Sequence, residues 1–95
     1  MPVTIAIPSA LRAYTGGAAA VSVEATRAGD ALDALTARFP DLARHLRGAD
    51  GKLRSFVNVY LHEDDIRHLD GEATPLHDGD TLVIVPSIAG GSDAR

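Results

Sequence analysis

Apolar residues alternate with small or polar ones in two segments near the start of the chain, 3–7 and 21–24. A period of two is typical of a β-strand with one face buried. Gly16 and Gly17 lie between the segments and favour a turn, because glycine adopts positive φ without steric cost. The pattern therefore predicts two strands joined as a hairpin.

The next segment changes to the helical period. Leu32, Leu35 and Phe39 fall on one face at this spacing. Asp30 is predicted to cap the amino terminus of the helix, with Asp33 as the returning carboxylate of a capping box. The sequence thus predicts a helix from about Asp30 to Phe39 with its apolar stripe toward a core.

Pro40 cannot continue that helix, but it can begin a new turn. Leu42 and Leu46 extend the apolar stripe beyond it. Segment 48–51 contains two glycines and is predicted to be a loop. Segment 56–61 is rich in β-branched and aromatic residues and gives the clearest strand pattern in the chain.

The last third of the chain alternates turns and strands. Segment 62–65 is a polar turn, and segment 66–70 is predicted as a short edge strand. A second turn at 78–80 precedes a nearly continuous apolar run at 81–85. Such a run is expected of a strand covered on both faces, and Pro86 ends its pairing.

The order of these elements is strand, strand, helix, strand, short strand, strand. One helix packed across a mixed sheet is an α+β arrangement that buries the apolar face of each. We expect the first and last strands to lie side by side and parallel in the middle of the sheet. A chain of 95 residues has room for a single domain of this kind.

Composition narrows the possible functions. The chain has no cysteine, which excludes a disulfide scaffold, a thiolate metal site and a cysteine nucleophile. Its net charge of −4 and scattered basic residues argue against nucleic acid as a partner. The absence of cysteine also fits a cytoplasmic protein. We further expect no membrane segment and no signal peptide.

Several motifs follow one another in a fixed order along the chain. They are Val3-Thr4-Ile5-Ala6-Ile7-Pro8 with Leu11 and Arg12, Phe56-Val57-Asn58-Val59-Tyr60, Asp64-Asp65-Ile66-Arg67, Leu76-His77-Asp78-Gly79-Asp80-Thr81-Leu82 and Val85-Pro86-Ser87-Ile88-Ala89-Gly90-Gly91. Together they resemble the MoaD/ThiS-type family of ubiquitin-like sulfur carriers, which have the β-grasp fold, and most closely its CysO type. The resemblance covers residues 3–91. The sequence departs from the family pattern at residues 92–95, because the second glycine is usually the last residue of such chains.

This resemblance implies a carrier domain at 1–91 and an extension at 92–95 that proteolysis removes. The working group would be the carboxylate of Gly91, with Gly90 beside it in a thin tail. A ubiquitin-activating-type adenylating enzyme would use ATP to activate that carboxylate for conversion to a thiocarboxylate. The chain itself would bind no cofactor or metal and would not be an enzyme, and a free carrier is expected to be a monomer.

The resemblance also implies partners. Besides the adenylating enzyme they are a sulfur-accepting biosynthetic enzyme, which makes cysteine or another sulfur-containing metabolite, and a JAMM-type metalloprotease that removes the extension. The predicted partner-binding residues are Phe56, Asn58, Tyr60, Pro86, Ile88 and Ala89. The alternative for Phe56 and Tyr60 is a place in the core, since alternation defines two faces of a strand without labelling them.

Other candidate groups have simpler interpretations. Segment 62–65 contains one histidine and three acidic residues, yet a solvated turn explains it better than a metal site. His45, with His68 and His77, shows no ligand spacing, and His45 is expected on a helical surface. Arg12 and Arg67 are either partner contacts or solvated surface residues.

Three functions remain open at this stage. The chain is a dedicated sulfur carrier, the small subunit of a molybdopterin synthase, or a ubiquitin-like modifier joined to lysines through Gly91. All three share one fold and one activation chemistry, so the sequence separates them poorly. The similarity to the CysO type favours the dedicated carrier.

Overall fold

The computed structural model describes residues 2–86. Within them the strands are β1 (Pro2–Ala6), β2 (Ala20–Glu24), β3 (Val57–Leu61), β4 (Asp64–Asp65) and β5 (Thr81–Pro86). The α-helices are α1 (Ala28–Arg38) and α2 (Pro40–Leu46), and the short 3-10 helices are η1 (Ser9–Thr15), η2 (Ile66–His68) and η3 (Gly71–Ala73).

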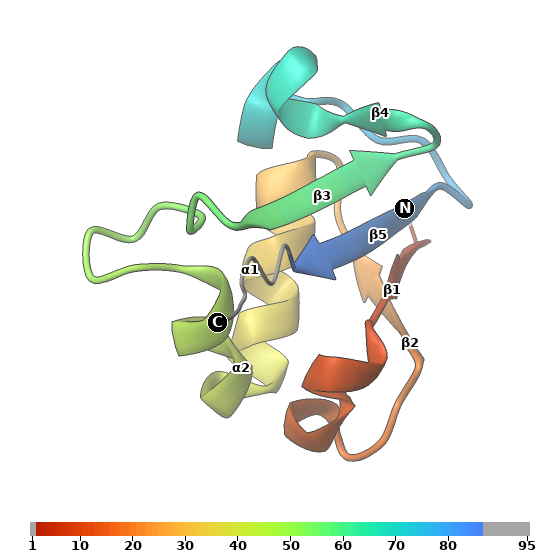
Figure 1. Ribbon diagram of the computed structural model, residues 1–95. Helices are drawn as coiled ribbons and strands as arrows, with labels where there is room; N and C mark the ends of the chain where they lie inside the picture. Colours follow the sequence, from red (N-terminus) through yellow and green to blue (C-terminus); the bar gives the residue numbers. More distant parts are fainter. Residues whose placement is uncertain (1, 87–95) are drawn as a thin grey trace.

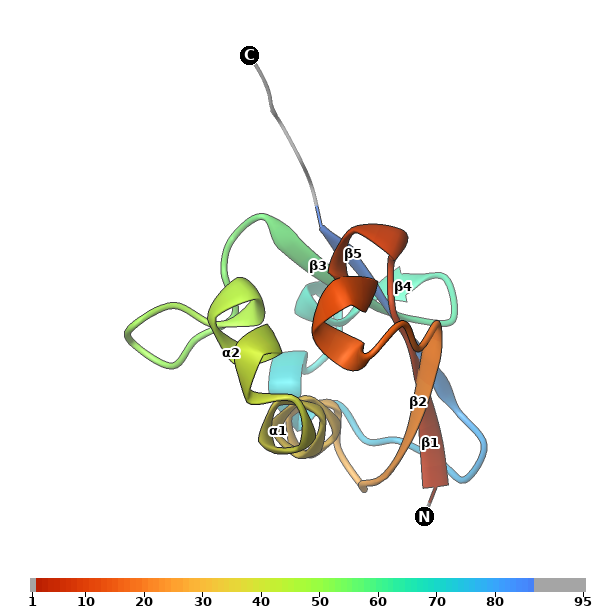
Figure 2. The same cartoon turned by 90° about the horizontal axis from the view of Figure 1, so that it is seen from below.

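The strands form one mixed sheet in the order β2-β1-β5-β3-β4 (Figure 1). β1 and β5 are parallel neighbours at its centre, as predicted. The other pairs, β1 with β2, β5 with β3, and β3 with β4, are antiparallel. The two helices lie on one side of this sheet, as the view from below shows (Figure 2).

The predicted hairpin of β1 and β2 is confirmed, but its connection is longer than a tight turn. The chain first forms η1 and then reverses through Gly16 and Gly17, which have φ values of 66° and 88°. Both angles lie in the left-handed region that glycine tolerates best. The excursion through η1 moves the end of β1 away from β5, and this separation shapes the site described below.

Helix α1 packs on the sheet through Leu32 and Leu35 of the predicted stripe, which are fully buried. Phe39, the third residue of that stripe, follows the helix and is half-buried. It begins at Ala28, two residues before the predicted cap. Asp30 lies in the first turn, and the Asp33 carboxylate pairs with Arg47 at 3.1 Å, so the predicted capping box is wrong. The start is set by tertiary structure instead, because the amide of Ala28 donates to the carbonyl of Thr74.

Helix α2 begins at Pro40, as expected of a proline in a first helical turn. Leu42 and Leu46 are fully buried beneath it, which confirms the extended stripe. His45, predicted on a helical surface, is half-buried instead and stacks on Tyr14 of η1, with ring centroids 4.1 Å apart.

Two predictions for the last third of the chain are wrong. The edge strand is β4 at Asp64–Asp65, whereas segment 66–70 begins with the helical turn η2. An Asp65 carboxylate oxygen accepts from the amide of Arg67, which favours the turn. β5 is also not covered on both faces. It buries Leu82 and Ile84, but Val83 and Val85 are 36% and 40% exposed.

Within residues 2–86 no helix is both long and apolar enough to span a membrane.

Candidate functional site

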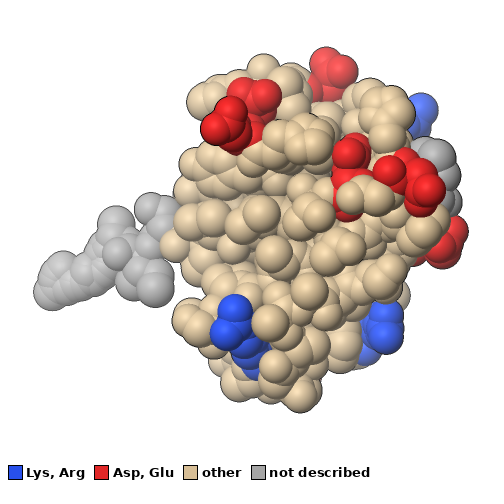
Figure 3. All heavy atoms as spheres, turned by 90° about the vertical axis from the view of Figure 1, so that its right-hand side faces the viewer, with Lys and Arg blue, Asp and Glu red and all other residues tan. Residues whose placement is uncertain are grey.

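The face of the sheet opposite the helices has no layer packed on it in the described chain. Ala6 of β1, Val83 of β5 and Tyr60 of β3 are register partners and form one row across this face. Val85 lies in the next row, opposite Asn58. Figure 3 looks at the side that carries β1 and β2, and charged side chains there gather toward the rim. We call the surface formed by Ala6, Phe56, Asn58, Tyr60, Val83 and Val85 the open face.

β3 contributes the predicted partner-binding residues Asn58 and Tyr60 to this surface, and a third, Phe56, lies in the turn just before the strand. Val57, Val59 and Leu61 point into the core, so the intervening Asn58 and Tyr60 lie on the other face, half-buried. Phe56, one residue before the strand, is 47% exposed. The alternative in which Phe56 and Tyr60 form the core is therefore wrong.

The beginning of β3 is fixed by Arg67. Its guanidinium donates to the Asn58 side-chain oxygen at 2.8 Å and to the carbonyls of Val57 and Arg54 at 2.6 and 2.9 Å. Val57 is also the register partner of Pro86, the last described residue of the chain. Arg67 thus holds the start of β3 opposite the last described residue of β5, a role that neither interpretation of Arg67 anticipated.

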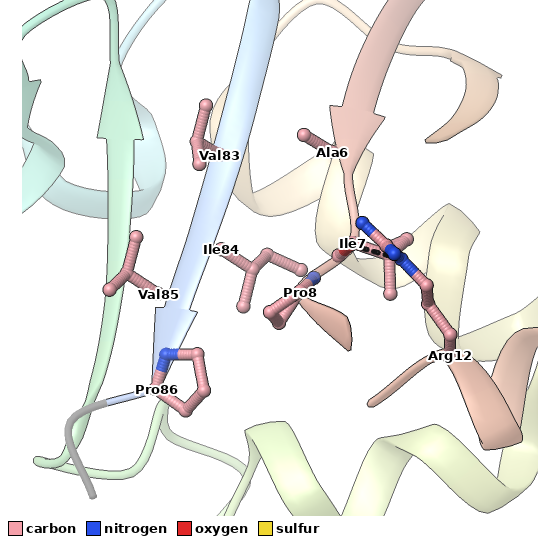
Figure 4. A pocket seen from close by; sticks show the side chains of 8 residues that line it. All are labelled: Ala6, Ile7, Pro8, Arg12, Val83, Ile84, Val85 and Pro86. Carbon is pink, nitrogen blue, oxygen red and sulfur yellow. Dashed lines mark hydrogen bonds between the residues drawn. The ribbon is translucent and has the colours of Figure 1, made fainter. Parts of the chain in front are cut away.

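On its other side, β5 borders a shallow groove (Figure 4). The described pairing of β1 with β5 ends at Ala6 and Val83, although β5 continues to Pro86. The space between the diverging segments is lined by Ala6, Ile7, Pro8, Arg12, Val83, Ile84, Val85 and Pro86. Arg12 reaches into this space from η1, and its Nε donates to the carbonyl of Ile7 at 3.1 Å.

The remaining predicted site residues, Ile88, Ala89, Gly90 and Gly91, lie outside the described residues. Pro86 is described, and it is half-buried at the end of β5. The structure therefore brings Pro86 together with Arg12 in one groove and pairs it with Val57. Pro86, the last described residue, therefore lies at the border of the open face.

The turn before β5 contains a charged cluster that the sequence did not single out. Asp80 is 13% exposed, and its carboxylate accepts from the amide of His77 at 2.8 Å. The imidazoles of His62 and His77 lie 3.6 and 3.7 Å from the same carboxylate. Backbone bonds from Gly79 to Pro2 and from Thr4 to Asp80 then join this turn to β1. The cluster anchors the parallel pair at the centre of the sheet.

No group of three or more histidine or acidic side chains in residues 2–86 is arranged to hold a metal ion. Segment 62–65, considered above as a metal site, consists of an exposed turn at 62–63 and the short strand β4. His62 adopts a φ of 59° there, the one positive φ outside glycine in this part of the chain.

A second cluster lies far from the open face and was not predicted. Arg47, after α2, makes two bonds to the Glu72 carboxylate of η3, at 2.7 and 3.0 Å. The hydrogen bond to Glu72 raises the pKa of Arg47, and the same bond lowers the pKa of Glu72 below its ordinary value. Arg47 and Glu72 are 25 residues apart in the sequence, so no local sequence pattern could reveal this contact.

The sequence and the fold match known proteins. The model of the ThiS family matches residues 5–91. Sulfur carrier protein CysO of Mycobacterium tuberculosis is 39% identical over 93 residues, which cover 96% of this chain and all of that protein. Small archaeal modifier protein 3 of Haloferax volcanii is 43% identical over 63 residues, covering 66% of this chain and 67% of that protein.

Solved structures agree with this result. A chain of the Amycolatopsis orientalis BexX/CysO complex has a TM-score of 0.84 at 36% identity, and the match covers 94% of this chain and 99% of that one. Small archaeal modifier protein 1 of Haloferax volcanii has a TM-score of 0.83 at 26% identity, with coverages of 96% and 100%. The predicted β-grasp fold is confirmed, and the chain belongs to the ThiS family of ubiquitin-like sulfur carrier proteins.

Proposed function

We propose that this chain carries sulfur as a thiocarboxylate on Gly91, which becomes the terminal residue when residues 92–95 are removed. The observation that carries the proposal is the similarity to CysO over nearly the whole chain, together with a family match that ends at residue 91. Sulfur carriers of this family are acted on by enzymes and are not catalysts themselves. The chain would accordingly serve as a protein co-substrate.

The proposed chemistry has two steps on one carboxylate. An adenylating enzyme first joins the Gly91 carboxylate to the adenylyl group of ATP and releases pyrophosphate. A sulfide donor then attacks the acyl carbon, AMP leaves, and a thiocarboxylate remains. A biosynthetic enzyme would take the sulfur from it, for cysteine or another sulfur-containing metabolite. ATP belongs to the enzyme, so the carrier needs no cofactor of its own.

Glycine suits the end of this tail because it has no Cβ. A backbone without side chains at Gly90 and Gly91 can enter a narrow channel and approach the nucleotide closely. In the full chain the carbonyl of Gly91 is an amide, which cannot be adenylated as a carboxylate can. Removal of residues 92–95, by a metalloprotease of the JAMM type, would therefore switch the carrier on.

The open face is the proposed docking surface for the enzymes that receive the tail. Phe56 and Val85 expose large apolar groups next to the end of β5, where the tail begins. The BexX/CysO structure is of a complex of a CysO protein with a second protein. By analogy, Pro86, Ile88 and Ala89 would contact an enzyme together with the open face.

The test compares two proteins, one ending at Arg95 and one ending at Gly91. Each is mixed with ATP, sulfide and the adenylating enzyme of the source organism, and its intact mass is measured. Only the protein that ends at Gly91 should gain the mass of one oxygen exchanged for sulfur. A chain ending at Gly91 with Gly91→Ala is the matched control, and it should react poorly.

Two results would contradict the proposal. Equal thiocarboxylation of the uncut chain at Arg95 would exclude Gly91 as the working residue. Failure of both proteins with an enzyme that is active on another carrier would exclude the carrier function itself.

A second function is supported by the similarity to the small archaeal modifier proteins. We infer that the same activated Gly91 could instead be joined to lysine amino groups of other proteins. Expression of a tagged chain in its source organism distinguishes the two functions. A modifier gives larger species that survive denaturation and thiol, and their peptides carry the tail on lysine. The molybdopterin synthase hypothesis stays a prediction that no specific observation favours.

A further inference from the structure

The groove beside β5 combines an apolar lining with one cation. Among the described residues that line it, Arg12 is the one with a charged side chain. The remainder of the lining comes from aliphatic and proline residues where β1 and β5 diverge (Figure 4). A partner group that fits this groove must therefore offer an aliphatic surface and a hydrogen-bond acceptor for the guanidinium.

Arg12 is held in place and still has donors to spare. Its Nε donates to the Ile7 carbonyl at 3.1 Å, which fixes the guanidinium over the groove. A guanidinium carries five N–H donors. In the part of the chain that the structure describes, the two terminal nitrogens of Arg12 have no hydrogen-bond or ion-pair partner. A planar fork with two free nitrogens matches the two oxygens of a carboxylate.

The surroundings of Arg12 strengthen an ion pair between its guanidinium and a carboxylate. Arg12 is half-buried, and the apolar groove walls lower the effective dielectric around an ion pair formed there. The protein as a whole has a net charge of −4, so a positive group in this place is not part of a general basic surface. The charge at the groove is complementary to an acidic partner.

The position of the groove identifies that partner. Pro86 lines the groove, and Gly91 follows it by only five residues. Five residues span at most about 17 Å. An enzyme that holds the Gly91 carboxylate beside ATP must therefore come within about 17 Å of Pro86, which brings its surface close enough to contact the groove.

We propose that Arg12 is a docking residue that binds an aspartate or glutamate on the adenylating enzyme, while a neighbouring aliphatic side chain of that enzyme fills the groove. This inference rests on the proposed function. Arg12 lies away from the reacting carboxylate and acts on the formation of the complex. Its loss should therefore change KM and leave kcat unaltered.

The experiment uses chains ending at Gly91 and follows ATP-dependent pyrophosphate release by the adenylating enzyme of the source organism, with the carrier concentration varied. Arg12→Gln should raise KM about tenfold, since a partly desolvated charge pair at an interface is lost. Arg27→Gln is the matched control. It removes the same charge from an exposed residue that does not line the groove, and its KM should stay close to that of the unchanged chain.

Salt provides a second measurement that needs no destabilising variant. Raising the salt concentration from about 50 to about 300 mM shortens the distance over which charges attract each other. It therefore weakens the attraction between Arg12 and an acidic residue of the enzyme without abolishing their direct contact. KM of the unchanged chain should rise across this range. Arg12→Lys keeps the charge and should retain most of that rise, whereas Arg12→Gln should lose most of it. Melting curves of each variant show whether it is folded.

The outcomes separate the two proposals. An unchanged chain that is never adenylated overturns the proposed function, and this inference with it. Normal adenylation with equal KM for Arg12→Gln and the unchanged chain overturns this inference alone. A fall in kcat at constant KM also overturns it, because Arg12 would then act on the chemical step. If Arg12→Gln does not fold, a flat salt dependence of the unchanged chain contradicts the proposal.

Discussion

Arg47 joins three segments that are distant along the chain. Its guanidinium binds Glu72 of η3, Asp33 of α1 and the carbonyl of Gly51 in the loop after α2. The arginine side chain is 15% exposed, whereas those of Glu72 and Asp33 are 40% and 70% exposed. Arg47 and Glu72 therefore form the more protected pair, and Asp33 adds a weaker, screened contact.

Glu72→Gln should lower the free energy of unfolding at pH 7 by about 1 kcal/mol, a value reduced for the exposure of the carboxylate. The folded pKa of Glu72 lies below its ordinary value of 4.5. Its stabilising contribution is therefore complete above that ordinary value and is lost as the pH falls through the lowered pKa. Urea unfolding at pH 7 and at about pH 3 checks this, with the difference between the two proteins disappearing in acid.

Asp33→Asn is the control for this prediction. It removes one negative charge near the same arginine, but from a more exposed carboxylate with one bond to Arg47. It should cost less than Glu72→Gln at pH 7. An equal cost for the two substitutions, or a Glu72→Gln effect that persists in acid, would show that the ion pair is not the cause.

At the scale of the elements, Gly29 sets how closely α1 approaches η3. A Cβ at this position would lie 2.8 Å from the Cβ of Glu72 and 3.1 Å from its carbonyl oxygen. Neither atom is the far end of a flexible side chain, so the backbone would have to move. The glycine is buried within the helix, where its low helix propensity is offset by this packing.

Gly29→Ala should therefore destabilise the protein by about 1–3 kcal/mol through overpacking, although alanine is the better helix former by about 1 kcal/mol. Ala37→Gly, at an exposed position of the same helix, measures the intrinsic propensity term alone. Chemical denaturation of both variants checks the sign. A Gly29→Ala protein that is more stable than the unchanged chain would show that α1 and η3 can separate at little cost.

Local patterns predicted most of the elements, and long-range contacts account for the differences. The alternation of β1 and the stripe of Leu32 and Leu35 are periodic, so their buried faces followed from the sequence alone. The start of α1 did not, because it depends on a bond from Ala28 to Thr74, far along the chain. The apolar run of β5 was misleading for a related reason, since Val83 and Val85 face a surface left open in the described chain.

In the candidate site, too, some features could be predicted from the sequence and others depend on long-range contacts. Phe56, Asn58 and Tyr60 could be placed on one face of a strand, but only the position of the helices shows which face it is. The groove at Arg12 could not be predicted, because it forms where β1 leaves the sheet and β5 continues. The resemblance to sulfur carriers came from the order of the motifs, which the family match has confirmed.

At the scale of the whole molecule, the sheet is asymmetric. One face holds the helices and the core, and the other exposes apolar groups around the end of β5. Exposed apolar surface of this kind is characteristic of interaction sites. Under the proposed function, its position beside the end of β5 would let a single enzyme bind the open face and Gly91 together.

Phe56→Ala should therefore lower kcat/KM for adenylation about tenfold, as loss of an aromatic anchor does at many interfaces. Its unfolding free energy should change by no more than about 0.5 kcal/mol, because the ring is on the surface. Leu69→Ala is the matched control, since Leu69 is similarly exposed, at 41% against 47%, but follows η2 and lies off the sheet. Steady-state kinetics and melting curves of both variants decide the matter. Equal losses of kcat/KM for the two substitutions would show that exposed apolar area matters wherever it lies on the protein surface. No loss for Phe56→Ala would remove Phe56 from the docking surface.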